Sequence, residues 1–232
     1  MHLPVIFEDD HLLVINKPSG MVIHPFDFSD EETVLDMLHK NYPQMFSINN
    51  SITLQDGRTI ALGGIVHKLD RETSGVLIVA KDQVTFDELR TQFIEGAVEK
   101  KYVAHVEGTI KQDSFRIDAP LGRSKKGYKQ STSPVNPRGP LREAITDVLV
   151  LARNSATTLV ELSPRTGRTH QLRAHMASIG HPIVGDIAYG STTPDSRIML
   201  HAQSITCTVD GTRNTYTVPS PEEFEPLYLD EQ

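Results

Sequence analysis

The sequence contains one cysteine and no tryptophan among its 232 residues. Because Cys207 has no second cysteine beside it, an internal disulfide and a zinc site built from cysteines are both excluded. Long apolar runs are also missing, since no stretch approaches the roughly 20 residues that a membrane helix needs. The N-terminal stretch lacks the basic start and apolar run of a signal peptide. We therefore expect a cytoplasmic protein with no membrane partner.

Positive charge is in short supply, and the formal net charge of −7 argues against a general nucleic-acid coat. The charges are unevenly placed along the chain. Residues 120–142 carry six basic and no acidic side chains, whereas residues 222–232 carry five acidic and no basic ones. The first segment indicates an exposed basic loop region and the second an acidic C-terminal tail. A basic face for an anionic partner is one interpretation, and ordinary solvated loops are the other.

Short apolar runs and helical spacings alternate without a strict strand–helix–strand order. The run 76–80, rich in β-branched residues, predicts a strand buried on both faces, and residues 86–96 have the pattern of an amphipathic helix. Ser29 and Glu32 have the spacing of a capping box, which predicts a helix running to about Tyr42. This mixture predicts an α+β fold with a mixed, mainly antiparallel central sheet flanked by helices and loops. The chain length favours one domain of two lobes.

The stretch 65–82 carries the most chemistry, because a polar cluster leads directly into the predicted strand. Asp70 lies between Lys68 and Arg71, and flanking cations favour the ionised form of a carboxyl group. An ionised aspartate on a loop at the start of a strand can act as a nucleophile or a base. A surface salt-bridge cluster at a turn explains the same residues equally well.

A second polar cluster surrounds the start of a predicted helix. Arg168 and Arg173 could pair with a carboxylate or bind phosphate oxygens, and a helix N-terminus favours an anion. His170 and His175 are five residues apart, not the four of a zinc-binding helix, and no H-E-x-x-H occurs. We therefore expect no metal site.

A third candidate is Tyr102, which follows two lysines at the start of a predicted strand. Its ring suits an ordinary core position. It equally suits stacking on a nucleobase, and the residues alone leave both roles open.

Five short motifs occur in an order that resembles the RluA family of pseudouridine synthases. They are N-K-P-S-G at 16–20, H-K-L-D-R-E-T-S-G at 67–75, K-K-Y at 100–102, T-G-R-T-H-Q-L-R at 166–173 and G-H-P-I-V-G-D at 180–186. Each motif is weak evidence alone, whereas the ordered set over almost the whole chain is specific. The resemblance implies the pseudouridine synthase fold, a single catalytic domain over residues 1–232 whose two lobes enclose a cleft.

The resemblance also implies the site and the reaction. Asp70 matches the family's essential aspartate, Tyr102 the tyrosine that stacks on the target uracil, and Arg168 the arginine that pairs with the aspartate. The implied activity is the isomerisation of a specific uridine in ribosomal or transfer RNA by base flipping and C-glycoside formation, without a cofactor or metal. Further RNA contacts are expected from His67, Lys68, Arg71, Thr73, Arg165, Arg173, Lys125, Lys126 and Lys129.

The chain departs from the family pattern at two points. Lys68 stands where the family most often has arginine, which keeps the positive charge but loses the planar guanidinium. We also expect a catalytic domain without the S4-like RNA-binding domain that many relatives carry at the N-terminus. We therefore expect a monomer whose RNA affinity comes from this domain, chiefly from its basic loop region.

Three other functions are compatible with parts of the sequence. A non-catalytic RNA-binding protein of the same fold would be free to lose Asp70, which is present. A glycosidase could use Asp70 with Glu72 or Asp186, but the chain has no tryptophan and 6% aromatic residues for a sugar platform. An interaction domain with a basic loop for an acidic partner leaves the ordered motifs unexplained.

Overall fold

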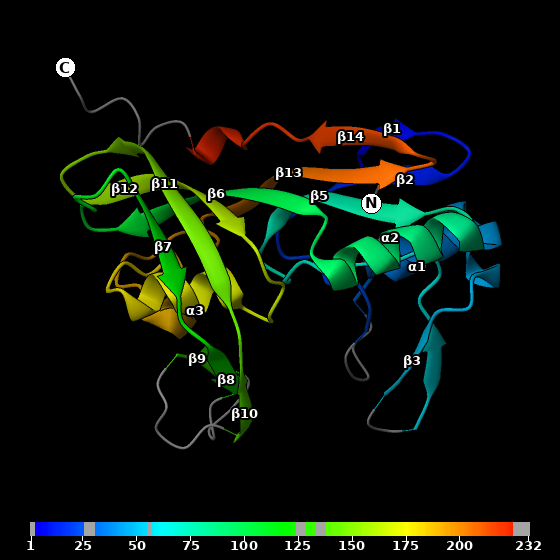
Figure 1. The fold of residues 1–232 in the computed structure, drawn as a ribbon, viewed down its shortest axis with the longest axis horizontal. Helices are drawn as coiled ribbons and strands as arrows, with labels where there is room; N and C mark the ends of the chain where they lie inside the picture. The colour runs from blue at the N-terminus through cyan, green and yellow to red at the C-terminus, as the bar shows by residue number, and fades with distance from the viewer. Residues whose placement is uncertain (1–2, 26–30, 55–56, 124–128, 133–137, 225–232) are drawn as a thin grey trace. The chain divides into compact units, whose positions relative to one another are not determined.

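The structure is a computed structural model that describes residues 3–25, 31–54, 57–123, 129–132 and 138–224 (Figure 1). The fold is α+β, with a central, mostly antiparallel sheet and, in the described residues, three α-helices. The chain divides into two compact units. The first comprises Met1–Val98 and Ser204–Val218, and the second Glu99–Gln203 and Pro219–Gln232. None of the helices in the described ranges is long and apolar enough to cross a membrane.

The first unit is built on β1 (Val5–Glu8), β2 (Leu12–Lys17) and β5 (Ser74–Ala80), which neighbour one another in that order. β2 pairs antiparallel with β5 along its whole length. All seven residues of β5 are buried, as its continuous apolar run predicts. β5 begins inside the 67–75 motif, and it is therefore hydrogen-bonded to β2 and buried on both faces.

Further strands complete the first unit. β13 (Leu200–Val209) belongs to the first unit from Ser204 onwards and pairs there with β14 (Thr212–Thr217). β3 (Ser51–Thr53) and β4 (Thr59–Ala61) pair antiparallel with each other in a small two-stranded sheet.

Two helices accompany these strands. α2 (Gln83–Glu95) begins at the N-cap Asp82 and ends at Gly96, as predicted. α1 (Val34–Asn41) begins later than expected, because its capping box is formed by Thr33 and Asp36. The predicted box at Ser29 and Glu32 is therefore wrong, although Ser29 itself lies outside the described residues.

The first turn of α1 also makes hydrogen bonds outside the helix. The amides of Val34 and Leu35 donate to the carbonyls of Val22 and Ile23, at 3.0 and 2.9 Å. These contacts between distant segments fix the first turn, and no local sequence signal reports them.

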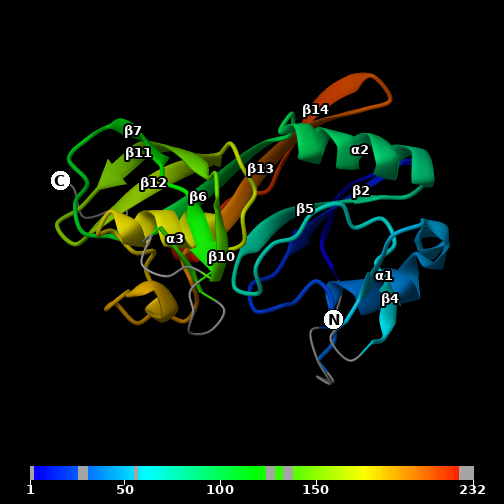
Figure 2. The same ribbon diagram turned by 60° about the horizontal axis from the view of Figure 1, so that its bottom comes forward.

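The second unit contains β6 (Glu99–Glu107), β12 (Thr157–Pro164), β11 (Ile145–Arg153) and β7 (Ser114–Asp118), hydrogen-bonded antiparallel in that order. α3 (Gln171–Ser178) lies against these strands (Figure 2). Its buried side chains Leu172 and Met176 join the apolar core of the strands. The T-G-R-T-H-Q motif therefore lies where β12 ends and α3 begins.

Residues 121–142 contain three short strands, which we call the arm: β8 (Leu121–Arg123), β9 (Gln130–Ser131) and β10 (Arg138–Arg142). They form a sheet in the order β10–β8–β9. The expectation of an irregular loop over 120–142 was wrong here. The strands are too short and polar to show an apolar alternation, and they exist through pairing with one another. Of the acidic tail, only 222–224 is described, as part of a 3₁₀ turn.

Candidate active site

Asp70 is half-buried in the turn that leads into β5. The amide of Thr73 donates to the carbonyl of Asp70 at 3.1 Å, which closes the turn. Thr73 is 3% exposed and immediately precedes the buried strand. The backbone that carries the Asp70 carboxylate is thus anchored to the core on its C-terminal side.

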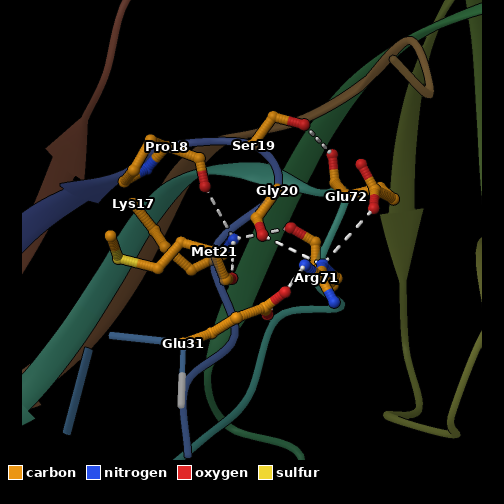
Figure 3. A network of polar contacts seen from close by, with 8 residues as sticks. All are labelled: Lys17, Pro18, Ser19, Gly20, Met21, Glu31, Arg71 and Glu72. Atoms are coloured by element: carbon orange, nitrogen blue, oxygen red, sulfur yellow. Dashed lines mark hydrogen bonds and ion pairs between the residues drawn. The ribbon is translucent and has the colours of Figure 1, made fainter. Parts of the chain in front are cut away.

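Lys17 also holds the C-terminal side of this turn (Figure 3). Its side chain is fully buried, and Nζ donates to the carbonyls of Pro18 and Met21 at 2.8 Å and to that of Arg71 at 3.0 Å. An ammonium group has three donors, and a buried one is tolerated only when they are satisfied. The N-K-P-S-G motif marked this lysine, but nothing in the sequence alone assigned it this role.

Two further bonds join the same segments. Ser19 Oγ donates to the carbonyl of Glu72 at 2.7 Å, and the amide of Gly20 donates to the carbonyl of Arg71 at 2.9 Å. Gly20 adopts φ +82°, a left-handed conformation that glycine takes without strain. The N-K-P-S-G turn therefore holds the two residues that directly follow Asp70.

The side chain of Arg71 binds both the N-K-P-S-G turn and Glu31. It donates to the carbonyl of Gly20 at 3.0 Å and to both carboxylate oxygens of Glu31 at 2.9 and 2.8 Å. The hydrogen bonds to Glu31 raise the pKa of Arg71. Arg71 is half exposed, so that it is an accessible cation already paired with a carboxylate.

Lys68 contacts His24, a residue that the sequence analysis missed. Lys68 Nζ lies 2.6 Å from His24 Nε2, while His24 Nδ1 faces the carbonyl of Pro25 at 3.0 Å. This arrangement requires Nδ1–H to donate to the carbonyl and Nε2 to accept from the ammonium. Burial lowers the pKa of Lys68, and burial together with the Lys68 charge lowers the pKa of His24. The neutral imidazole thus orients the lysine that replaces the family's arginine.

His67 and Thr73 are turned inward rather than towards a ligand. His67 Nε2 accepts from the amide of Ile78 at 3.1 Å, and its ring stacks on Phe93 of α2 at a centroid distance of 5.0 Å. The side chain of Thr73 is buried. Both side chains are thus held within the first unit, and their contact with RNA stays a prediction.

In the second unit, Tyr102 lies on β6 opposite Leu162 of β12. Its half-buried ring packs against the apolar core of the unit. Lys100, two residues earlier, has a pKa lowered by burial. Its Nζ lies 3.9 Å from the position that a side chain at Gly167 would occupy. The K-K-Y strand therefore lies beside the T-G-R loop.

Gln171 organises the loop that carries Arg168. Its Oε1 accepts from the Arg168 amide at 3.0 Å and from Thr166 Oγ1 at 2.7 Å. Its Nε2 donates to the carbonyl of Ile145 at 3.0 Å and to Thr146 Oγ1 at 3.1 Å. The amide is buried and fully engaged, so that the orientation of its two ends is fixed by its partners.

The network around Gln171 extends to the centre of α3. Thr146 Oγ1 lies 2.9 Å from His175 Nδ1, and His175 Nε2 lies 2.9 Å from the carbonyl of Ala119. His175 is fully buried, and burial lowers its pKa. The second histidine considered as a metal ligand is thus a neutral, structural residue.

The guanidinium of Arg168 is held at one end only. Arg168 Nε donates to the carbonyl of Glu143 at 3.0 Å. Its terminal nitrogens make no hydrogen bond to the described residues, and the side chain is exposed. The loop therefore holds the Arg168 guanidinium in place by Nε, and its terminal nitrogens can donate to a carboxylate or a phosphate. Its pairing with Asp70 stays a prediction.

The two other arginines of this motif differ in accessibility. Arg165 is exposed and shares the carboxylate of Asp147 with Arg116, each at 2.7 Å. Arg173 is 7% exposed and forms two bonds with the fully buried Asp186, at 2.7 and 2.8 Å. Since both of these donors are engaged inside the unit, the expectation that Arg173 contacts RNA is not supported.

Of the three lysines of residues 120–142 that are expected to contact RNA, Lys129 is exposed next to β9. Lys125 and Lys126 lie outside the described residues. Among the described ranges, no cluster of three or more histidine, cysteine, aspartate or glutamate residues is arranged to hold a metal ion.

Comparison with known proteins identifies the class. Residues 11–178 match the family model for RNA pseudouridylate synthases. The chain is 37% identical over 98% of its length to the uncharacterized RNA pseudouridine synthase YlyB of Bacillus subtilis, covering 72% of that protein. It is 34% identical over 96% of its length to the dual-specificity RNA pseudouridine synthase RluA of Escherichia coli, covering 94% of that protein.

A solved structure agrees with these sequence relatives. Human RNA pseudouridylate synthase domain containing 1 superposes with a TM-score of 0.76 at 26% identity, covering 95% of this chain and 84% of that one. The chain spans only 51% of another relative, the ribosomal large subunit pseudouridine synthase D of Nitrosomonas europaea. The chain belongs to the RNA pseudouridylate synthase family, and within it to the RluA type. It is an RNA pseudouridine synthase, an isomerase, and RNA is its substrate.

Proposed function

We propose that the enzyme converts a specific uridine of a structured ribosomal or transfer RNA into pseudouridine, with Asp70 as the catalytic carboxylate. The observation that supports this best is the attachment of the Asp70 turn, which Lys17 binds at the carbonyl of Arg71 and which leads directly into the buried strand β5. A carboxylate on so constrained a backbone meets a flipped nucleotide in one geometry, and such positioning lowers the barrier of the reaction.

The reaction requires bond exchange but no redox step. The bond between N1 of uracil and C1′ of the ribose breaks, the base turns over, and C5 bonds to C1′ while C5 loses a proton and N1 gains one. Asp70 would attack C1′, attack C6 of the base, or remove a sugar proton to give a glycal, and these routes remain alternatives. Tyr102 would stack on the flipped uracil and offset part of the unstacking cost. Arg168 would hold Asp70 ionised and oriented.

RNA binding is proposed for the exposed cations. Lys68, held by His24, would approach the flipped nucleotide, and Lys129 would bind phosphates together with Lys125 and Lys126. Arg71 and Arg165 are paired with carboxylates and would exchange these partners for phosphate oxygens. We also propose that residues 1–232 form a single catalytic domain of two lobes with a cleft, acting as a monomer in the cytoplasm without a cofactor or metal.

A tritium-release assay tests the assignment of Asp70. RNA labelled at C5 of uridine should release tritium to water with the unmodified protein and not with Asp70→Asn. Exposed Asp10 in the same unit offers a matched control, because Asp10→Asn changes the same group outside the site. Undiminished release from a folded Asp70→Asn would disprove the catalytic role. Absence of release by the unmodified protein on total cellular RNA would favour the non-catalytic alternative.

The target uridine requires a second experiment. Pseudouridines are mapped in total RNA from cells with and without the gene, and the positions that disappear identify the substrate. A lost position in neither ribosomal nor transfer RNA would contradict the proposed substrate class.

A further inference from the structure

The hydroxyl group of Tyr189 joins the arm to the start of α3. The amide of Gln130, in β9, donates to Tyr189 Oη at 2.8 Å, and His170 Nδ1 lies 3.0 Å from the same oxygen. The amide occupies one lone pair of the hydroxyl oxygen, which leaves the hydroxyl proton available for a hydrogen bond with Nδ1 of His170. β9 also packs against α3 at this place.

Asp186 and Arg173 hold Tyr189 in place. It ends the 3₁₀ turn Ile187–Tyr189, whose N-cap Asp186 accepts from the Tyr189 amide at 3.3 Å. Asp186 is fully buried and also binds Arg173, whose guanidinium lies 4.9 Å from the centre of the Tyr189 ring. The ion pair and the cation–π contact immobilise the ring. The hydroxyl of Tyr189 therefore has a fixed position between β9 and His170.

His170 lies in a backbone conformation that needs support. It is the N-cap of α3 with φ +52°, in the left-handed region that non-glycine residues adopt rarely. Its ring meets the Tyr189 ring edge to face at 5.7 Å. Because His170 follows Arg168 by two residues, whatever holds His170 also limits the movement of the Arg168 loop.

We propose that Tyr189 is a positioning residue that docks the arm against the T-G-R-T-H-Q loop through its hydroxyl. Lys129, which is exposed next to β9, is one of the six basic residues of 120–142, so that docking sets the place from which it reaches an RNA backbone. The hydroxyl contributes to RNA binding without touching RNA. This inference rests on the proposed function, since it concerns RNA as the substrate.

The variant Tyr189→Phe removes one oxygen and keeps the ring, the cation–π contact and the core. We expect the KM for RNA to rise about fivefold with kcat changed less than about twofold, as for the loss of one hydrogen bond in binding. The Gln130 amide should exchange with solvent about fivefold faster, measured by hydrogen exchange of the arm. A thermal unfolding curve verifies that the variant is folded.

Tyr42→Phe is the matched control. The hydroxyl of Tyr42 donates to Glu8 at 3.0 Å in the first unit, so that the same oxygen is lost outside the arm. This variant should change neither KM nor the exchange of Gln130. If the Tyr189 hydroxyl had only a structural role, Tyr189→Phe would lower the unfolding temperature, as Tyr42→Phe would, and leave the KM for RNA unchanged.

A double-mutant cycle tests whether the effect runs through the arm. If docking places Lys129, Lys129→Ala should raise KM less in the Tyr189→Phe background than in the unmodified protein. An additive cycle, or an unchanged KM and Gln130 exchange in Tyr189→Phe, would overturn the inference while RNA turnover by the unmodified protein continues. Failure of the proposed function is a different result, because then no variant, including the unmodified protein, releases tritium from uridine-labelled RNA.

Discussion

Nζ of Lys17 lies 3.0 Å from the carbonyl oxygen of Arg71, the residue that follows Asp70. The contact joins two motifs separated by some fifty residues of chain and places a buried positive charge directly behind the proposed catalytic turn. The same ammonium binds two further carbonyls in the N-K-P-S-G turn. The first motif of the family thus acts on the second through backbone hydrogen bonds.

Replacing Lys17 by methionine should impair both folding and catalysis. Lys17→Met keeps the length of the side chain but removes three hydrogen bonds, so that the carbonyls of Pro18 and Met21 lose this donor and that of Arg71 keeps the Gly20 amide. This loss should lower the free energy of unfolding by about 3 kcal/mol. Tritium release should fall because the Asp70 turn loses its attachment. Urea unfolding and the release assay measure the two effects.

Lys101 provides the control for this variant. It forms a half-exposed ion pair with Glu161, so that Lys101→Met should cost less than about 1 kcal/mol. Equal losses in both variants would contradict the special role of the buried ammonium.

Gln171 should control the Arg168 loop. Gln171→Glu has the same shape but turns a donor into an acceptor that faces the carbonyl of Ile145. We expect a loss of about 2 kcal/mol in stability and of about tenfold in kcat at a temperature where the variant is folded. Exposed Gln112→Glu is the matched substitution and should change neither. A normal kcat in Gln171→Glu would show that the loop is positioned by other contacts.

Lys68 should matter for RNA turnover more than for stability. Lys68→Ala removes a cation at the site, and we expect kcat/KM to fall about tenfold with unfolding changed by under about 0.5 kcal/mol. The pKa of His24, which the Lys68 charge helps to lower, should rise in this variant and can be followed by an NMR titration. Lys40→Ala, on the exposed end of α1, is the control. Unchanged turnover would exclude Lys68 from the site.

Stability in acid should depend on Glu107. Burial acts to raise the pKa of its carboxyl group, but hydrogen bonds from Ser191, Thr193 and Thr192 outweigh this and lower the pKa to about 2. The unfolded chain therefore binds a proton before the folded one does, so the contribution of Glu107 is complete above about pH 4.5 and lost as the pH falls towards 2.

Glu107→Gln isolates this contribution. The variant should be less stable than the unmodified protein at neutral pH, and the difference should shrink between about pH 4.5 and 2, as measured by thermal unfolding. Glu95→Gln, on the exposed end of α2, should leave the pH profile unchanged. A constant difference at all pH values would mean that Glu107 is not protonated in this range.

Local sequence was sufficient for several features of the protein. The β-branched run of 76–80 and the pattern of 86–96 predicted β5 and α2, because burial on both faces and helical periodicity are written into neighbouring residues. The ordered motifs identified the family, which the comparisons confirm. They also predicted Asp70, Tyr102 and Arg168 as the catalytic set, and these roles stay predictions.

Tertiary structure decided which polar residues of the motifs point inward. The sequence marks His67, Thr73 and Arg173 as polar, but only the tertiary structure shows that His67 accepts from the Ile78 amide, that Arg173 binds Asp186 and that Thr73 is buried. The arm and the roles of Lys17, Gln171 and Tyr189 likewise depend on contacts between segments far apart in the chain. The physical reason is that a buried polar group must find its partner wherever the fold provides one, and sequence spacing does not record that place.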